Sequence, residues 1–248
     1  MSHAIGTFRT VERSDPSDEA GTGAPAWYPP CKVVADAVVA ASLLALTAPL
    51  LALLMIAVKA TSRGPAVYSQ LRVGRGGRAF RIFKLRTMVD DCEKATGPRW
   101  SVRNDPRVTR LGRFLRKSHL DELPQLWNVL RGEMSLVGPR PERPEFVARL
   151  EREVPAYRDR LEVRPGITGL AQVQLPPDEA IEDVRRKVRC DLCYIRRLDP
   201  WLDLRILLGT VMKVAGVPFQ VTRRVLALPG GEAAPGAEAG SITRLRSI

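Results

Sequence analysis

One continuous apolar segment constrains this sequence more than any other feature. Residues 33–58, VVADAVVAASLLALTAPLLALLMIAV, carry a single charge, at Asp36. As a straight α-helix this segment would be roughly 39 Å long, which is enough to cross the hydrocarbon core of a bilayer. A signal peptide is disfavoured because the apolar run is too long and the 32 residues before it carry a net charge of −1. The segment therefore predicts contact with a membrane.

Pro49 lies near the centre of this segment and leaves two arrangements open. A proline inside a helix removes one backbone hydrogen bond and bends the helix. A bent segment could enter the membrane and return to the same face, provided that the freed backbone groups find partners. The charges on either side favour instead a single span, with the basic bulk of the chain inside. Residue physics alone does not choose between a re-entrant and a spanning helix.

The charge of the chain indicates an anionic partner. Its 248 residues include 39 Lys and Arg against 27 Asp and Glu, and residues 72–117 alone contain fourteen basic and four acidic residues. Nucleic acid, anionic lipid and phosphorylated substrates all fit such an excess. The four cysteines are too few for a disulfide framework, and the Cys190-x-x-Cys193 pair has no second pair at zinc spacing. A reducing, cytosol-facing protein is expected.

The remaining pattern predicts a helix-rich α+β fold. Two short strands, 66–71 and 79–85, flank the turn VGRGG and predict a β-hairpin. Helices are expected over the ranges 106–117 (capped by Asp105), from Glu122 onward, 145–161 with an interruption at Pro155, 178–198, and 201–215. The last is too short for an upright span, and it reads equally as an interfacial helix or as a core helix.

Composition also suggests the organisation of the chain. Stretches rich in Gly and Pro predict flexible tails at residues 1–31 and 217–248. Between them we expect a membrane helix over residues 32–60 and one cytosol-facing folded domain over residues 61–216.

An acidic pair, Asp121-Glu122, lies within the run SHLDELPQLWNVL, directly after the arginine-rich stretch. Asp121 suits the N-cap of a helix that starts at Glu122, with Pro124 in the first turn. The helix end and the nearby arginines would lower the pKa of Asp121 and keep it ionised, the form needed for attack on phosphorus. Glu122 would suit Mg²⁺, which takes carboxylate oxygens together with substrate phosphates. Taken alone, the pair is better explained by ordinary capping.

Two further stretches point to anion binding. Gly138-Pro139-Arg140-Pro141 holds an arginine between two prolines, so its guanidinium is presented from a stiff backbone. The run RPGITG, residues 164–169, is a glycine-rich, cationic loop that would let an anion approach backbone N–H groups. Each stretch, taken alone, is also compatible with an ordinary turn.

Taken together and in order, these stretches resemble a known family. The proline-interrupted apolar segment, PAVYSQLRVGRGGRAFRIFKLRTM, NDPRVTRLGRFLRKSHLDELPQLWNVLRGEMSLVGPRPE and RPGITGLAQV are similar to the bacterial sugar transferases, over about residues 32–215. These are the monotopic polyprenyl-phosphate phosphoglycosyltransferases. The resemblance implies Mg²⁺-dependent transfer of a sugar-1-phosphate from a UDP-sugar to undecaprenyl phosphate, with release of UMP. Such a reaction initiates exopolysaccharide, O-antigen or other glycoconjugate assembly.

The resemblance also implies roles for individual residues. Asp121 matches the nucleophile that carries the phosphosugar, and Glu122 matches the metal ligand. Substrate binding is implied for Lys84, Arg86, Arg116, Pro139, Arg140 and Pro141, and the RPGITG loop adds Arg164 and Thr168 as expected substrate contacts.

For the membrane segment, the resemblance implies a re-entrant helix with both ends in the cytosol, at the bacterial inner membrane. Here the family's Ser-Pro kink reads Ala48-Pro49. The chain resembles the small, minimal form of the family, and a homodimer is compatible with it. The alternative is a membrane-anchored basic protein that only binds or scaffolds. That alternative explains the charge and the apolar segment but gives no reason for the DE pair, PRP or RPGITG. The sequence does not name the sugar.

Overall fold

The computed structural model describes residues 24–92, 97, 105–176 and 180–230. Most of both predicted tails, residues 1–23 and 231–248, lies outside the described residues. The described part of the C-terminal tail corrects the expectation of flexibility, because it contains a helix, α8 (Phe219–Val225). The side chains of Thr222, Leu226 and Leu228 pack over Gly209 of the preceding helix, which explains why this segment is ordered against the domain.

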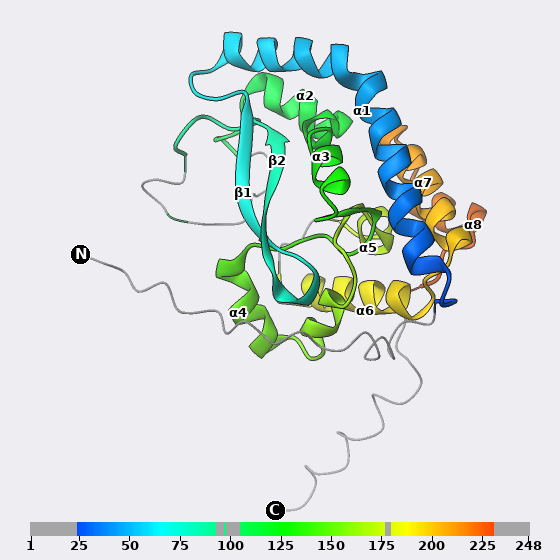
Figure 1. Cartoon of the computed structure of the whole chain (residues 1–248). Helices are drawn as coiled ribbons and strands as arrows, with labels where there is room; N and C mark the ends of the chain where they lie inside the picture. The colour runs from blue at the N-terminus through cyan, green and yellow to red at the C-terminus, as the bar shows by residue number, and fades with distance from the viewer. Residues whose placement is uncertain (1–23, 93–96, 98–104, 177–179, 231–248) are drawn as a thin grey trace, which may run out of the picture.

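The apolar segment forms one long helix, α1 (Tyr28–Thr61), which is long and apolar enough to cross a membrane. Figure 1 shows that α1 bends sharply midway along its length. Beyond the bend, Leu51, Leu54 and Met55 pack with Leu115 of the helix below. Most of the apolar side chains of α1 are exposed, as Leu46, Leu53 and Ile56 illustrate. Such a surface is expected to contact lipid.

Pro49 accounts for the bend in α1. Proline has no N–H, so the carbonyl of Ala45, four residues earlier, loses its usual helical partner. Just before the proline, the Thr47 hydroxyl donates to the Leu43 carbonyl at 2.7 Å, a side-chain bond that also favours helix bending. The predicted bend is therefore confirmed.

Two small sheets carry much of the site. Strands β1 (Val67–Val73) and β2 (Ala79–Leu85) pair antiparallel, with Val67 opposite Leu85, and they confirm the predicted hairpin. A short turn, η2 (Arg75–Gly77), joins them. Strands β3 (Ser135–Val137) and β4 (Gly166–Thr168) form a parallel pair that the sequence did not predict. The backbone just after β3 lies very close to the backbone just before β4. A Cβ at Gly138 would collide with the Arg164 carbonyl, so glycine is required there.

The helices differ from the expected ranges mainly at their ends. Helix α2 (Arg110–Ser118) starts four residues late, because Thr109 caps it by accepting from the Gly112 N–H at 2.9 Å. Asp105, the expected cap, instead forms an ion pair with Arg107 at 2.6 Å. The break at Pro155 is confirmed. The remaining helical segments are η3 (Leu120–Glu122), α3 (Gln125–Leu130), α4 (Pro144–Glu153), η4 (Tyr157–Leu161), α5 (Leu170–Gln174), α6 (Ile181–Arg196) and α7 (Pro200–Val214).

Helix α7 combines the two roles that the sequence left open. Leu202 and Ile206 are buried in the main core, whereas Trp201, Leu208 and Val211 are exposed. One face therefore packs inward as a core helix does. The other is an apolar surface suited to a membrane interface.

A buried polar cluster fixes the first part of α1 to the domain. Asp203 of α7 accepts hydrogen bonds from the Tyr28 hydroxyl, from Lys32 Nζ at 2.6 Å and from the Tyr194 hydroxyl at 2.7 Å. Asp36 accepts from the Ser135 hydroxyl of β3 at 2.6 Å. The one charge in the apolar segment thus points into the protein.

We expect Asp203→Ala to destabilise the fold by about 3 kcal/mol, because it removes the carboxylate shared by Tyr28, Lys32 and Tyr194. Lys32 would keep only Asp36 at 3.4 Å, and the Tyr194 hydroxyl only the Val137 carbonyl at 3.1 Å. A useful comparison is Asp199→Ala, which removes only the α7 cap that accepts from the Leu202 N–H at 2.9 Å, and which should cost about 1 kcal/mol. Thermal unfolding in a neutral lipid nanodisc measures both. Equal effects of the two changes would contradict the anchoring role of Asp203.

Candidate active site

The acidic pair lies in the single-turn helix η3, between α2 and α3. His119 joins α2 to η3 in the left-handed conformation, with φ at 56°, and this reverses the chain direction before the pair. The expectation that Asp121 caps a helix is wrong: α3 begins only at Gln125, and Pro124 occupies the cap position without a side-chain hydrogen bond. Neither Asp121 nor Glu122 therefore caps the helix that follows.

Glu122 is held in place by two cations. Its Oε1 accepts from Lys84 Nζ at 2.6 Å and from an Arg140 guanidinium nitrogen at 2.9 Å. Burial alone would raise the pKa of Glu122, but Arg140 and Lys84 outweigh it and hold the pKa well below its usual range. Glu122 is thus a fixed, permanently charged carboxylate at neutral pH.

The Pro139-Arg140-Pro141 segment is itself held by arginines. Arg160 donates to the Arg140 carbonyl at 2.9 Å, and Arg72 donates to the Pro141 carbonyl at 3.1 Å. These bonds fix the backbone from which the Arg140 guanidinium reaches Glu122. The predicted stiff presentation of Arg140 therefore has a direct structural basis.

Asp121 is in a different situation from its neighbour. Its side chain is nearly buried, with 8% of the residue exposed, and no hydrogen bond or ion pair reaches its carboxylate from the described residues. Burial raises the pKa of Asp121 to about 6 and the charge of Glu122 adds to the rise, while Lys84, Arg116 and Arg140 oppose it. This corrects the expectation of a lowered pKa for Asp121: the nearby arginines do lower it, but burial outweighs them. Above pH 6 the result is an ionised, weakly solvated carboxylate, which is a competent nucleophile.

Arg116 and Arg86, both predicted substrate contacts, lie near the end of strand β2. Arg116 Nε donates to the Thr87 hydroxyl at 2.9 Å, and Arg116 is one of the cations that act on the Asp121 charge. Arg86 is buried and donates to the carbonyl of Ser62, directly after α1, at 2.8 Å. Its Nε and Nη1 are buried without a hydrogen-bond partner among the described residues.

A cavity of about 510 Å³ opens beside Glu122 and Arg140. Thr168, a predicted contact, also lines it, and its hydroxyl lies 2.7 Å from that of Thr210. The wall includes apolar side chains from both α1 and α7, namely Leu43, Leu207 and Val214. Cationic groups next to an apolar wall suit a ligand that has a charged headgroup and an apolar chain.

Sequence reasoning missed Lys213, which also lines this cavity. Its Nζ donates to the Gln172 carbonyl at 2.6 Å, and burial, followed by the charge of Arg140, lowers its pKa. Lys213 lies on a largely apolar helix far along the chain. The only sequence signal is that Lys213 is the one charged residue after Arg205 in WLDLRILLGTVMKVA, residues 201–215.

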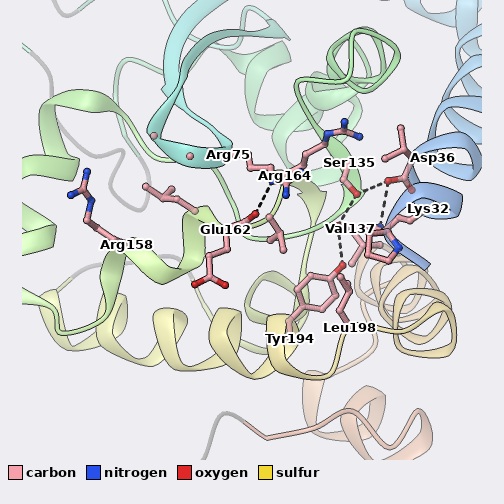
Figure 2. Close-up of a pocket in the computed structure, with 16 residues that line it drawn as sticks. Lys32, Asp36, Arg75, Ser135, Val137, Arg158, Glu162, Arg164, Tyr194 and Leu198 are labelled. Carbon is pink, nitrogen blue, oxygen red and sulfur yellow. Dashed lines mark hydrogen bonds and ion pairs between the residues drawn. The ribbon is translucent and has the colours of Figure 1, made fainter. Parts of the chain in front are cut away.

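The structure separates two residues that the sequence placed in one loop. Thr168 lines the cavity beside Glu122, whereas Arg164 lines a second cavity of about 450 Å³ (Figure 2). Strand β3 lies between them: Leu136 faces the first cavity, and Ser135 and Val137 face the second. Alternate residues of β3 thus point to the two cavities. Arg164 precedes β4 and lies on the side of Ser135 and Val137, whereas Thr168, at the end of β4, lies on the side of Leu136.

The donor set at the acidic pair is compatible with Mg²⁺. The described residues contain no group of three or more His, Cys, Asp or Glu side chains that would form an all-protein metal cage. Mg²⁺ in phosphoryl-transfer sites commonly uses one or two carboxylates and completes its shell with substrate phosphates and water. Both bonds to Glu122 go to Oε1, so Oε2 accepts none from the described residues.

Comparison with known proteins defines the class to which this fold and site belong. Residues 27–216 match the family model described as bacterial sugar transferase, and the chain belongs to that family. A relative from Caulobacter vibrioides, named UDP-glucose:undecaprenyl-phosphate glucose-1-phosphate transferase, is 48% identical over 184 residues, which is 73% of this chain and 68% of the relative.

Two further relatives are longer than this chain. An undecaprenyl-phosphate glucose phosphotransferase from Komagataeibacter xylinus is 46% identical over 69% of this chain and 33% of its own length. A UDP-N-acetylgalactosamine-undecaprenyl-phosphate N-acetylgalactosaminephosphotransferase from Aeromonas hydrophila is 42% identical over 72% of this chain and 42% of its own length. The chain therefore spans less than half of these two relatives.

Proposed function

We propose that this protein transfers a sugar-1-phosphate from a UDP-sugar to undecaprenyl phosphate and releases UMP. The observation that carries the proposal is the contrast within the acidic pair: Asp121 is nearly buried and unengaged by the described residues, while Glu122 is fixed by Lys84 and Arg140. The Asp121 carboxylate, kept apart from hydrogen-bond donors, is able to react as a nucleophile. The fixed Glu122 carboxylate is able to position a bound group. The relatives' names support the substrates.

In the first step, an Asp121 carboxylate oxygen attacks the sugar-side phosphorus of the donor. A P–O bond forms to Asp121, and the P–O bond to UMP breaks, so that UMP departs and a phosphosugar remains on the enzyme. In the second step, a phosphate oxygen of the lipid attacks the same phosphorus and the bond to Asp121 breaks. Lys84, Arg116 and Arg140 are the cations that stabilise negative charge at Asp121, and they would also stabilise charge on the phosphoryl oxygens in both steps.

Mg²⁺, held by Glu122 with the donor diphosphate, would neutralise phosphate charge when bound. We expect a chelator such as EDTA to stop UMP release and excess Mg²⁺ to restore it. The measurement is UMP formed by purified protein in lipid nanodiscs with undecaprenyl phosphate and a panel of UDP-sugars. A panel is needed because relatives of this chain are named for both glucose and N-acetylgalactosamine. The UDP-sugar that gives the fastest UMP release identifies the donor. Undiminished UMP release in the chelator would remove the metal from the account.

We further propose that α1 is re-entrant, with both ends at the cytosolic face of the inner membrane. The bend at Pro49 and the cavity wall formed by Leu43 and Thr47, just before the proline, support this arrangement. It would hold the acidic pair where a lipid phosphate and a soluble nucleotide sugar can both arrive. A binding or scaffold protein with the same surface would release no UMP and would be indifferent to substitution of Asp121.

The pH dependence of turnover follows from the raised pKa of Asp121. The protonated carboxyl is a poor nucleophile, so donor turnover at low donor concentration should rise about tenfold per pH unit below pH 6 and level off above it. Initial rates of UMP release between pH 4.5 and 8 measure this profile. A rate that is flat down to pH 4.5 would contradict the buried nucleophile.

A further inference from the structure

The second cavity, of about 450 Å³, lies at the foot of α1 and is shown in Figure 2. Five parts of the chain line it: the first turns of α1, the turn between β1 and β2, strand β3, the segment from η4 to β4, and the end of α6. Lys32 and Asp36 of α1 lie on one side in Figure 2, with Arg75 and Arg164 across from them and Tyr194 below. Strand β3 separates this cavity from the acidic pair, so it is a different site from the one proposed above.

Most charges that line this cavity are matched within the fold. Lys32 pairs with Asp36 at 3.4 Å and with Asp203 at 2.6 Å. Arg158 pairs with Glu151 at 3.2 Å. The remaining acidic lining residue, Glu162, is exposed, and its backbone carbonyl accepts from Arg75 Nε at 2.9 Å.

Arg164 is the exception among these charges. Its side chain is half-buried, and no hydrogen bond or ion pair joins it to any described residue. Burial lowers its pKa, and the charge of Arg75 lowers it further, which Asp36 only partly offsets. Two guanidinium groups that repel one another at the edge of a cavity are stabilised by an anion between them.

We propose that this cavity is a second anion site, which binds the phosphate group of a ligand between Arg164 and Arg75. Guanidinium groups bind phosphate oxygens through paired N–H donors, and the rim at Gly76 and Gly77 carries no side chain that would block entry. The phosphate belongs either to an anionic phospholipid or to a soluble phosphate ester. Trp27, directly before α1, is exposed, as tryptophans at membrane interfaces are, and such a position would bring lipid headgroups near this end of α1.

The test measures ligand-induced thermal stabilisation of the full chain at constant ionic strength. One arm adds inorganic phosphate or UMP to protein in neutral phosphatidylcholine nanodiscs. The other arm replaces part of the phosphatidylcholine with phosphatidylglycerol. Four proteins are compared: wild type, Arg164→Gln, Arg78→Gln as a control for loss of one charge on the same hairpin outside the cavity, and Arg140→Gln to remove binding at the acidic-pair cavity.

We expect one of the two arms to stabilise wild type, Arg78→Gln and Arg140→Gln, and Arg164→Gln to weaken the apparent affinity about tenfold. The arm that responds identifies the source of the phosphate. If Arg164→Gln does not fold, the same comparison is made with Arg75→Gln, whose side chain is exposed. Stabilisation that survives Arg164→Gln and is lost in Arg140→Gln, or no stabilisation in either arm, would overturn the proposal. Neither result depends on transfer activity, so the proposed function is tested separately.

Discussion

Asp121→Asn is expected to lower UMP release by roughly a thousandfold or more, because the amide cannot take over the nucleophilic role of the carboxylate. The shape of the side chain is retained, and no hydrogen bond among the described residues is lost. Membrane association through α1 should persist. A matched control is Asp159→Asn, which removes one carboxylate from an exposed position of η4 and should leave UMP release unchanged.

The same substitution should make the protein more stable, which separates loss of chemistry from loss of fold. The pKa of Asp121 in the folded state is about 6, above the reference value of 3.8, so the folded state binds the proton more tightly than the unfolded state. The free energy of unfolding therefore falls as pH rises from about 4 to 6, by roughly 3 kcal/mol. Asp121→Asn escapes this loss and should unfold at a higher temperature than wild type above pH 6. An inactive variant that is also less stable at pH 7.5 would contradict the electrostatic account.

Glu122→Gln has the second largest expected effect. The two cations that share Oε1, Lys84 and Arg140, would lose their common negative partner. We expect UMP release to fall roughly a hundredfold and the free energy of unfolding to fall by about 2 kcal/mol, because the largely buried Lys84 ammonium is left without a compensating charge, whereas solvent screens the half-exposed Arg140. The concentration of Mg²⁺ that gives half-maximal turnover should also rise.

Glu133→Gln is the matched comparison for this change. Glu133 accepts from Asn128 at 2.8 Å and pairs with Arg131 at 3.1 Å, away from the acidic pair. Its loss should reduce stability with little effect on UMP release. An unchanged requirement for Mg²⁺ in Glu122→Gln would assign Glu122 a purely structural role.

Much of the fold follows from local sequence pattern. The hairpin, the break at Pro155 and the bend in α1 were predictable because turn glycines and prolines act over a few residues. The parallel pair β3–β4 was not, because each strand has three residues and periodicity needs more. Helix α8 was missed because it is ordered by contacts with α7 rather than by its own seven residues.

The candidate site also has features that the sequence predicted and features that it did not. The order of motifs indicated which residues gather near Asp121, and the structure places Lys84 and Arg140 on Glu122. The pKa of Asp121 was misjudged because its burial is set by tertiary packing, whereas counting nearby arginines considers charge alone. Lys213 enters the cavity from more than ninety residues away, and Arg164 and Thr168 face different cavities because they lie on opposite sides of a short sheet.

The most direct measurement is mass spectrometry of active protein that is incubated with its UDP-sugar donor in the absence of lipid acceptor. The account predicts a sugar-phosphate adduct, of the mass set by the donor, on the peptide that contains Asp121, and its disappearance once undecaprenyl phosphate is added. An unmodified Asp121 peptide in a preparation that releases UMP as a burst under the same conditions would contradict covalent transfer through this residue.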